Sequence, residues 1–324
     1  PNIPKEPSAH ARRPTATTTV ALLLAWLIAA APSMAADDPK PSACLAAIAG
    51  QIDVQRLQSL AVQHSWRYAT VDSWARDAVK SVHGSKPFCD LDPVLAAMEL
   101  MFNGSSYHKE PVIYVKDLAV VKDLVAHPVS LTDDERRRIL TTRMVSYDFL
   151  QSPIVAERIK QLSGDTLRKT AMDRLQNAIN LYESIGFTLN IVPNPSGLHD
   201  APWSPLMAAA AMSSKRDTGL SDEQQLRLGD LAMSLRLAWT KRDVSGINAA
   251  IGDLEKTVQS IAPTSVYPSV ESREKEVKYR RMNLMRWAWG VYIFAFFVSI
   301  FVVASGYRWV RGFGLFLLIV ALGL

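Results

Sequence analysis

The stretch INAAIGDLEKTVQSI, residues 247–261, decides the fold class. Its apolar residues recur at alternating spacings of four and three, at Ile247, Ile251, Leu254, Val258 and Ile261. That spacing places them on one face of an α-helix and predicts a partner helix against that face. The preceding segment supplies a partner, because the capping box at 221–224 (SDEQ) opens a second run with apolar residues at helical spacing. We therefore expect a pair of packed helices.

Further helix signals lie upstream of this pair. We expect helices over Cys44–Leu60, from an Asp72 N-cap to His83, and from Asp92-Pro93 to Phe102. A capping box at Thr132–Glu135 opens a helical stretch with uncertain breaks that ends near Ile185. Short β-type runs occur at 66–71, 111–115 and 188–192. The expected fold is mainly α with a small β element, a sheet of two or three strands embedded in helices.

Downstream of the helix pair, the sequence has the character of a membrane protein. A charged helix is expected over 271–286, and Trp287–Tyr307 is an uncharged, mostly apolar run of about 20 residues, long enough to span a bilayer. A basic link at 308–311 precedes a second apolar run at 312–324, too short to span. The chain also begins without methionine. We therefore expect a fragment of a larger integral membrane protein, with 312–324 the start of a second, truncated transmembrane helix.

The N-terminal segment, residues 1–35, resembles a secretory signal peptide. Arg12 and Arg13 precede the apolar run Val20–Ala31, and Ser33-Met34-Ala35 matches a cleavage pattern of small residues. The alternative is a short uncleaved anchor, which gives the same topology. Residues 36–270 are then an exported, mostly helical domain in the periplasm, attached to the bacterial inner membrane.

The basic residues before and after the apolar run disagree with this topology. More of them lie before it, at Lys275, Lys278, Arg280, Arg281 and Arg286, than after it, at Arg308 and Arg311. A simple count would place the preceding side in the cytoplasm, but long domains are translocated largely regardless of charge. We therefore let the signal peptide decide, and expect the bases before the span to meet lipid headgroups or an acidic partner.

Charge and cysteine content limit the possible partners and cross-links. The formal net charge of +5 is modest, and no basic–aromatic pattern typical of nucleic-acid binding occurs. The two cysteines, Cys44 and Cys89, both fall in the exported region, where a disulfide is permitted. A disulfide, two buried free thiols and a redox-active pair all stay open. We find no metal-binding or nucleophile motif, so the residues alone predict no catalytic or metal site.

Four segments, taken in chain order, resemble a known family. They are VQHSWRYATVDSWAR at 62–76, Asp92-Pro93-Val94 with the run 111–115, LNIVPNP at 189–195 with Trp203, and EVKYRR at 276–281 followed by WAWGVY at 287–292. Together they resemble the extracytoplasmic part of system II cytochrome c synthetases of the CcsA/ResC type, which are often fused to a CcsB/ResB portion. Within the first segment Arg67, Asp72 and Arg76 match the family motif. We expect a capping or salt-bridge role for them.

The resemblance implies a function in haem handling. Such proteins carry haem across the membrane and present it to apocytochrome c, with a CcsB/ResB-type partner and a thiol-reducing protein. The family's haem ligands and tryptophan-rich loop have no counterpart in this sequence. We therefore transfer no catalytic or cofactor-binding residue, and expect haem to bind the longer protein but not this chain alone. The alternative function is a non-catalytic, membrane-tethered interaction or assembly-adaptor domain.

Overall fold

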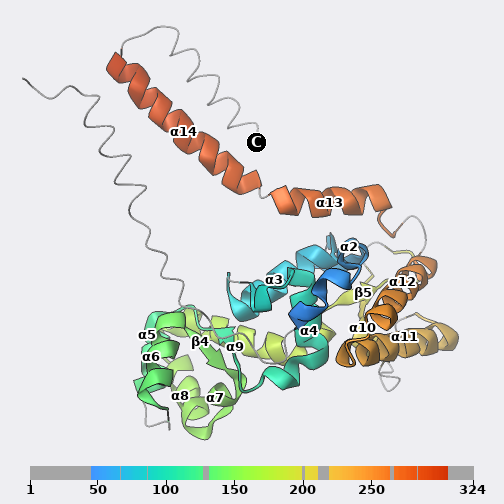
Figure 1. The fold of residues 1–324 in the computed structure, drawn as a ribbon, viewed down its shortest axis with the longest axis horizontal. Helices are drawn as coiled ribbons and strands as arrows, with labels where there is room; N and C mark the ends of the chain where they lie inside the picture. The colour runs from blue at the N-terminus through green and yellow to red at the C-terminus, as the bar shows by residue number, and fades with distance from the viewer. Residues whose placement is uncertain are drawn as a thin grey trace, which may run out of the picture. The chain divides into compact units, whose positions relative to one another are not determined.

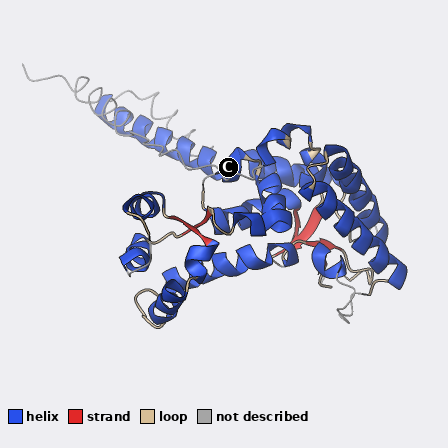
Figure 2. Cartoon of the chain, turned by 60° about the horizontal axis from the view of Figure 1, so that its bottom comes forward, coloured by secondary structure: helices blue, strands red, loops and turns tan. Residues whose placement is uncertain are grey.

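The computed structural model describes residues 45–65, 67–85, 87–126, 131–198, 201–210, 219–262, 266–282 and 284–305. All of them belong to one compact unit, Lys40–Leu324. The predicted signal peptide lies outside the described residues. The described part is mainly helical, with small two-stranded sheets between the helices (Figure 1, Figure 2). The helical fold class is confirmed.

Thirteen α-helices occur in the described ranges, from α2 to α14. Their bounds are α2 Val54–Gln58, α3 Val71–His83, α4 Pro93–Asn103, α5 Leu118–Ala126, α6 Asp133–Thr142, α7 Tyr147–Gln151, α8 Pro153–Ser163, α9 Lys169–Ser184, α10 Leu206–Ala210, α11 Asp222–Thr240, α12 Val244–Ile261, α13 Val270–Met282 and α14 Leu284–Ser305. Short 3₁₀ turns lie at Leu45–Ala47, Ala49–Gln51, Phe88–Asp90, Gly104–Tyr107 and Ile185–Phe187.

The strands form three separate antiparallel pairs rather than the single small sheet that we expected. β1 (Ala61–His64) pairs with β2 (Arg67–Thr70), β3 (Pro111–Tyr114) with β4 (Met144–Ser146), and β5 (Asn190–Val192) with β6 (Ser204–Pro205). The three predicted β runs are confirmed as β2, β3 and β5. Their partners were not predicted, because strands this short carry almost no alternation of apolar and polar residues.

Several helix ends agree with the sequence prediction and two do not. The capping boxes at Thr132 and Ser221 are present, and Asp92 caps α4 by accepting from Val94 N. Helix α3, however, is capped by Thr70, whose side chain accepts from Ser73 N, so the prediction of an Asp72 N-cap was wrong. The expected helix Cys44–Leu60 is broken into two 3₁₀ turns and α2, which Asp53 caps anew.

The predicted pair of helices is present as α11 and α12, which lie side by side (Figure 1). Every residue of the predicted stripe is buried, from Ile247 to Ile261. The turn between the helices is tight. A Cβ on Gly246 would lie 2.6 Å from Asp243 Oδ2 and 3.0 Å from Ala238 Cβ, so only glycine fits there.

The predicted membrane segment coincides in the structure with helix α14, Leu284–Ser305. Among the described residues, no helix is both long enough and apolar enough to cross a membrane. Residues 306–324, which include the predicted second span, lie outside the described ranges. The transmembrane assignments therefore stay predictions.

A buried carboxylate joins the helix pair to the rest of the core. Glu99 lies on α4 among apolar residues, and its side chain has no exposed surface. Arg242, at the end of α11, donates to it twice, from Nη1 to Oε2 at 2.6 Å and from Nη2 to Oε1 at 2.7 Å. The Tyr107 hydroxyl donates to Oε1 at 2.6 Å, and the Trp239 indole N–H donates to Oε2 at 2.7 Å. The carboxylate thus links α4, the turn at 104–107 and α11.

The ionisation of Glu99 follows from these contacts. Desolvation by burial would raise the pKa of Glu99, but the hydrogen bonds from Arg242, Tyr107 and Trp239 outweigh it and hold the pKa below its usual value. The carboxylate is therefore ionised at neutral pH. The signal for this network in the sequence is a lone glutamate in the apolar run of residues 93–102, from which we made no prediction.

We expect Glu99→Gln to lower the free energy of unfolding by about 3 kcal/mol at pH 7, because Arg242 would lose its buried counter-charge. Because the pKa of Glu99 is lower in the folded chain, its contribution is complete above the ordinary glutamate pKa of about 4.3 and is lost as the pH falls through the folded value. Urea unfolding across pH 3–7 measures this. The difference in the free energy of unfolding between wild type and Glu99→Gln should be constant above about pH 5 and shrink below about pH 4.

The exposed Glu157 of α8 provides the matched control. Glu157→Gln should change the free energy of unfolding by less than about 0.5 kcal/mol. A difference between wild type and Glu99→Gln that does not depend on pH would contradict the role assigned to the carboxylate.

Candidate functional site

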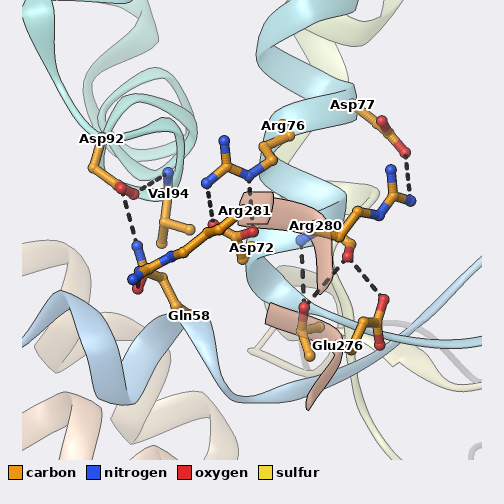
Figure 3. A network of polar contacts seen from close by, with 11 residues as sticks. Gln58, Asp72, Arg76, Asp77, Asp92, Val94, Glu276, Arg280 and Arg281 are labelled. Atoms are coloured by element: carbon orange, nitrogen blue, oxygen red, sulfur yellow. Dashed lines mark hydrogen bonds and ion pairs between the residues drawn. The ribbon is translucent and has the colours of Figure 1, made fainter. Parts of the chain in front are cut away.

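The best-organised polar surface of the described chain lies where α13 packs against β2 and α3 (Figure 3). We call this contact the α13 interface. It is defined on α13 by Arg273, Glu276, Arg280 and Arg281, and on the rest of the unit by Gln58, Ser59, Ser73 and Asp77. Helix α13 carries many charges, so charged and polar groups, rather than an apolar stripe, hold it against the unit.

Beside the interface, α3 contains a buried ion pair. Asp72 has no exposed side-chain surface, and Arg76, one turn later, donates to it from Nε to Oδ2 at 2.8 Å and from Nη2 to Oδ1 at 3.0 Å. Hydrogen bonding to Asp72 raises the pKa of Arg76 against the opposing effect of burial. The salt bridge expected for these residues is therefore present. Arg67 is exposed at the start of β2, away from this pair.

Two contacts to α3 attach the part of α13 from Glu276 to Arg280. The Ser73 hydroxyl donates to Glu276 Oε1 at 2.8 Å. Arg280 Nη2 lies 3.9 Å from Asp77 Oδ2, and His64 Nε2 approaches the same oxygen at 3.3 Å. Arg280 and His64 thus share the Asp77 carboxylate at the edge of the interface, and Figure 3 shows the Arg280 side of this contact.

A relay of hydrogen bonds connects α13 to the start of α4. Arg281 donates from Nη2 to Oε1 of Gln58, a buried side chain. Gln58 in turn donates from Nε2 to Asp92 Oδ2 at 2.9 Å, and Asp92 Oδ1 caps α4 through Val94 N at 2.9 Å. The position of Arg281 is therefore coupled to a helix end in the core (Figure 3).

The first half of α13 is held by Arg273, which is buried. Its Nη1 donates to the Ser59 carbonyl at 2.9 Å, and its guanidinium carbon lies 5.2 Å from the centre of the Tyr267 ring. Tyr267 stacks on Trp203, with ring centres 5.9 Å apart, and burial raises the pKa of its hydroxyl. This cation–π contact extends the interface into a second small apolar cluster built on Ala61, Trp203 and Val266.

These contacts change one expectation about the bases before α14. Arg280 and Arg281 have partners within the chain, and Lys275 lies 2.7 Å from Glu271 on its own helix. Of the five bases, Arg280 and Arg281 therefore help to hold α13 in place, whereas Lys275 is paired only within its own helix.

The four segments quoted above for the family resemblance meet around this interface. Segment 62–76 contacts the fourth segment through Ser73 and Glu276. It contacts the third through Gln63, whose Oε1 accepts from Trp203 N at 2.8 Å. Asp92 of the second segment reaches Arg281 of the fourth through Gln58. Segments more than a hundred residues apart in the chain thus form one structural unit.

A cavity of about 750 Å³ opens beside the interface, between α2, α12 and α13. Its walls mix charges of both signs, with Arg56, Lys278 and Arg281 set against Asp53, Glu255 and Glu274. Arg56 Nε is 3.2 Å from Glu255 Oε2, so part of this charge is already paired. Such a cavity is suited to polar or zwitterionic groups rather than to a flat apolar ring.

The described histidines are dispersed over the unit. His64 lies beside Asp77, the His83 ring is bonded through Nδ1 to the Val112 carbonyl at 2.9 Å, and His108 packs between the rings of Tyr147 and Tyr182. These rings are in three separate places. Within the described ranges, no group of three or more His, Cys, Asp or Glu side chains could hold a metal ion. His10, His127 and His199 lie outside those ranges.

The state of the two cysteines stays open among the three alternatives. Cys89 is buried in the 3₁₀ turn Phe88–Asp90, where it has a left-handed backbone with φ of 55°. Its proposed partner, Cys44, lies outside the described residues.

Comparison with protein-family models and with curated proteins finds no match for this chain.

One prediction from the α13 interface concerns Arg281. Replacing it by Ala leaves the buried Gln58 oxygen without its donor, which costs about 1–3 kcal/mol of local stability. We expect the amides of α13 in the full chain to exchange with solvent deuterium roughly ten times faster. Lys278→Ala, an exposed substitution on the same helix, is the control and should leave exchange unaltered. Equal exchange in both variants would show that Arg281 does not hold the helix.

A further prediction separates the two arginines of the family-like motif. Arg76→Ala should lower the free energy of unfolding by about 3 kcal/mol, since Asp72 would stay buried without its counter-charge. Arg67→Ala removes an exposed side chain and should cost less than about 0.5 kcal/mol. Urea denaturation of the two variants tests this. A comparable loss in both would mean that Arg67 has a structural role that its exposure does not suggest.

Proposed function

We propose that the chain is a component of system II cytochrome c maturation, in which its helical domain assists haem delivery and attachment to apocytochrome c at the periplasmic side of the bacterial inner membrane. The observation that carries this proposal is the meeting of the four family-like segments at the α13 interface. The resemblance rests on four separate stretches of sequence. Because these stretches meet at one interface, they can serve one structural role together.

In this proposal α13 is the connection between the domain and the membrane. We assign residues 287–307 to a transmembrane helix, and α13 immediately precedes it. Arg273, Arg280 and Arg281 fix α13 to the domain, so the domain is held at a defined orientation instead of hanging from a loose linker. A defined orientation is what a surface needs if it is to present one partner to another.

The partners we propose are apocytochrome c, a CcsB/ResB-type partner and a thiol-reducing protein. Docking of such proteins depends on shape and on moderate charge rather than on a reactive side chain. We propose that haem is held by the longer protein to which we assign this chain, because the described histidines are dispersed. We derive no catalytic step from the residues of this chain.

The second candidate function is a non-catalytic, membrane-tethered interaction or assembly-adaptor domain. The observation that favours it is the saturation of the polar networks. The carboxylates of Glu99 and Asp72 each accept hydrogen bonds from an arginine on both oxygens, an arrangement that suits a structural role more than proton transfer. The two candidates differ in whether cytochrome c production depends on the protein.

The test is made in the source cell, with the protein in its natural context. We expect Arg280→Glu with Arg281→Glu to lower the amount of haem-bearing cytochrome c at least threefold, because α13 would carry like charges toward Asp77 and lose its hold on Gln58. Haem staining of separated membrane proteins measures the cytochromes, and immunoblotting measures the variant. Arg137→Glu on the exposed face of α6 is the control.

Deletion of the gene gives the decisive comparison. Loss of all haem-bearing c-type cytochromes supports the maturation proposal. Wild-type cytochrome levels in the deletion strain would contradict it and leave the adaptor function, whose loss should affect another membrane assembly.

A further inference from the structure

Helix α11 has apolar side chains on two opposite faces. Its inner face is buried against α10 and α12, and the outer face of such a helix is expected to be polar. On that outer face, however, Leu226 is 51% exposed, Met233 57% and Leu237 56%. Met233 lies about two turns after Leu226, and Leu237 lies about one turn after Met233, so the three residues form a single stripe along the helix. We call it the outer stripe.

The two ends of the outer stripe carry opposite charge. Asp222 and Glu223 lie exposed in the first turn of α11, and Arg236 and Lys241 lie exposed at its end. The helix dipole has the complementary sense, positive at the first turn and negative at the last. An antiparallel helix laid along the stripe would therefore meet favourable charges at both ends if it had the same charge pattern.

We propose that the outer stripe binds the outer stripe of a second copy of this chain, with the two α11 helices antiparallel about a two-fold axis between Leu231 and Ala232. Leu226 and Leu237 lie at equal distances on either side of that axis, so each Leu226 packs against Leu237 of the other copy. Glu223 and Lys241 are related in nearly the same way and form an ion pair between copies. A two-fold contact requires this kind of self-complementary surface.

The chemistry of the stripe favours a second copy over an unrelated partner, because Leu226 is matched by Leu237 and Glu223 nearly by Lys241 on the helix itself. Met233 is the exception, since the two-fold axis relates it to Asp230. Asp230 works against the association, since the two copies of its carboxylate come close to the two-fold axis. The dimer is therefore weak, and the Asp230→Asn variant is expected to associate more tightly than wild type.

Cysteine cross-linking of the full chain tests the arrangement. The single variants Leu226→Cys and Leu237→Cys are oxidised separately and as an equimolar mixture, and the linked peptides are identified by mass spectrometry so that Cys44 and Cys89 are distinguished. We expect a 226–237 link in the mixture, at least fivefold above any 226–226 or 237–237 link, because like positions in the antiparallel pair are about 16 Å apart along the helix. Predominant 226–226 and 237–237 links would indicate parallel helices and overturn the proposal, as would the absence of any link.

A charge exchange provides a second readout. Both cysteine variants are given Glu223→Lys, or both are given Lys241→Glu. Either change places like charges opposite each other and should lower the yield of the 226–237 cross-link at least threefold. Combining one variant of each kind restores opposite charges at both ends and should restore the yield. Circular dichroism confirms that all variants are folded. A yield indifferent to these charges would show that the stripe does not pair in this register.

Discussion

The packing of this protein depends on one buried charge. Glu99 lies in the apolar helix α4, and a carboxylate in that position would be very costly without partners. Arg242 supplies the counter-charge, and Tyr107 and Trp239 supply the remaining donors. Because these partners come from different parts of the chain, α11 and α4 can pack only in the arrangement that brings all of them to the same carboxylate. The buried ion pair thus selects the arrangement of helices that apolar contacts alone would leave less defined.

The α13 interface also depends on contacts between charged and polar side chains, here at the surface. Arg281 reaches the capped start of α4 through Gln58, and Arg280 shares Asp77 with His64. These contacts join a charged helix to the core by directional bonds, whereas an apolar helix would be held by area alone. If α14 lies in a membrane, as we propose, the orientation of the domain above that membrane is set by these few polar side chains.

The outer stripe of α11 and the α13 interface use different elements of the same unit. A partner bound at the stripe would leave the α13 interface intact, since the stripe faces away from the packed side of α11 and the interface is built on α3, β2 and α13. If both proposals hold, a self-associating domain attached to a membrane would present its proposed partners in pairs. This combination is compatible with both candidate functions.

The sequence by itself determined the elements whose signals are local. The stripe from Ile247 to Ile261, the capping boxes at Thr132 and Ser221, and the Asp92-Pro93 start of α4 each act within one or two helical turns, so they could be recognised from spacing alone. The salt bridge of Asp72 and Arg76 was also within reach, because one turn of helix separates its members.

Only the tertiary structure decided the contacts between distant segments. Strands β4 and β6 are too short to carry a pattern, and become strands because β3 and β5 offer unpaired backbone groups beside them. Two of the partners of Glu99, Trp239 and Arg242, lie more than a hundred residues away in the chain. Arg280 and Arg281 likewise contact Asp77 and Gln58, which lie far from them in the sequence. Local sequence patterns do not show which distant side chains will be buried together. The packing of the helices decides this.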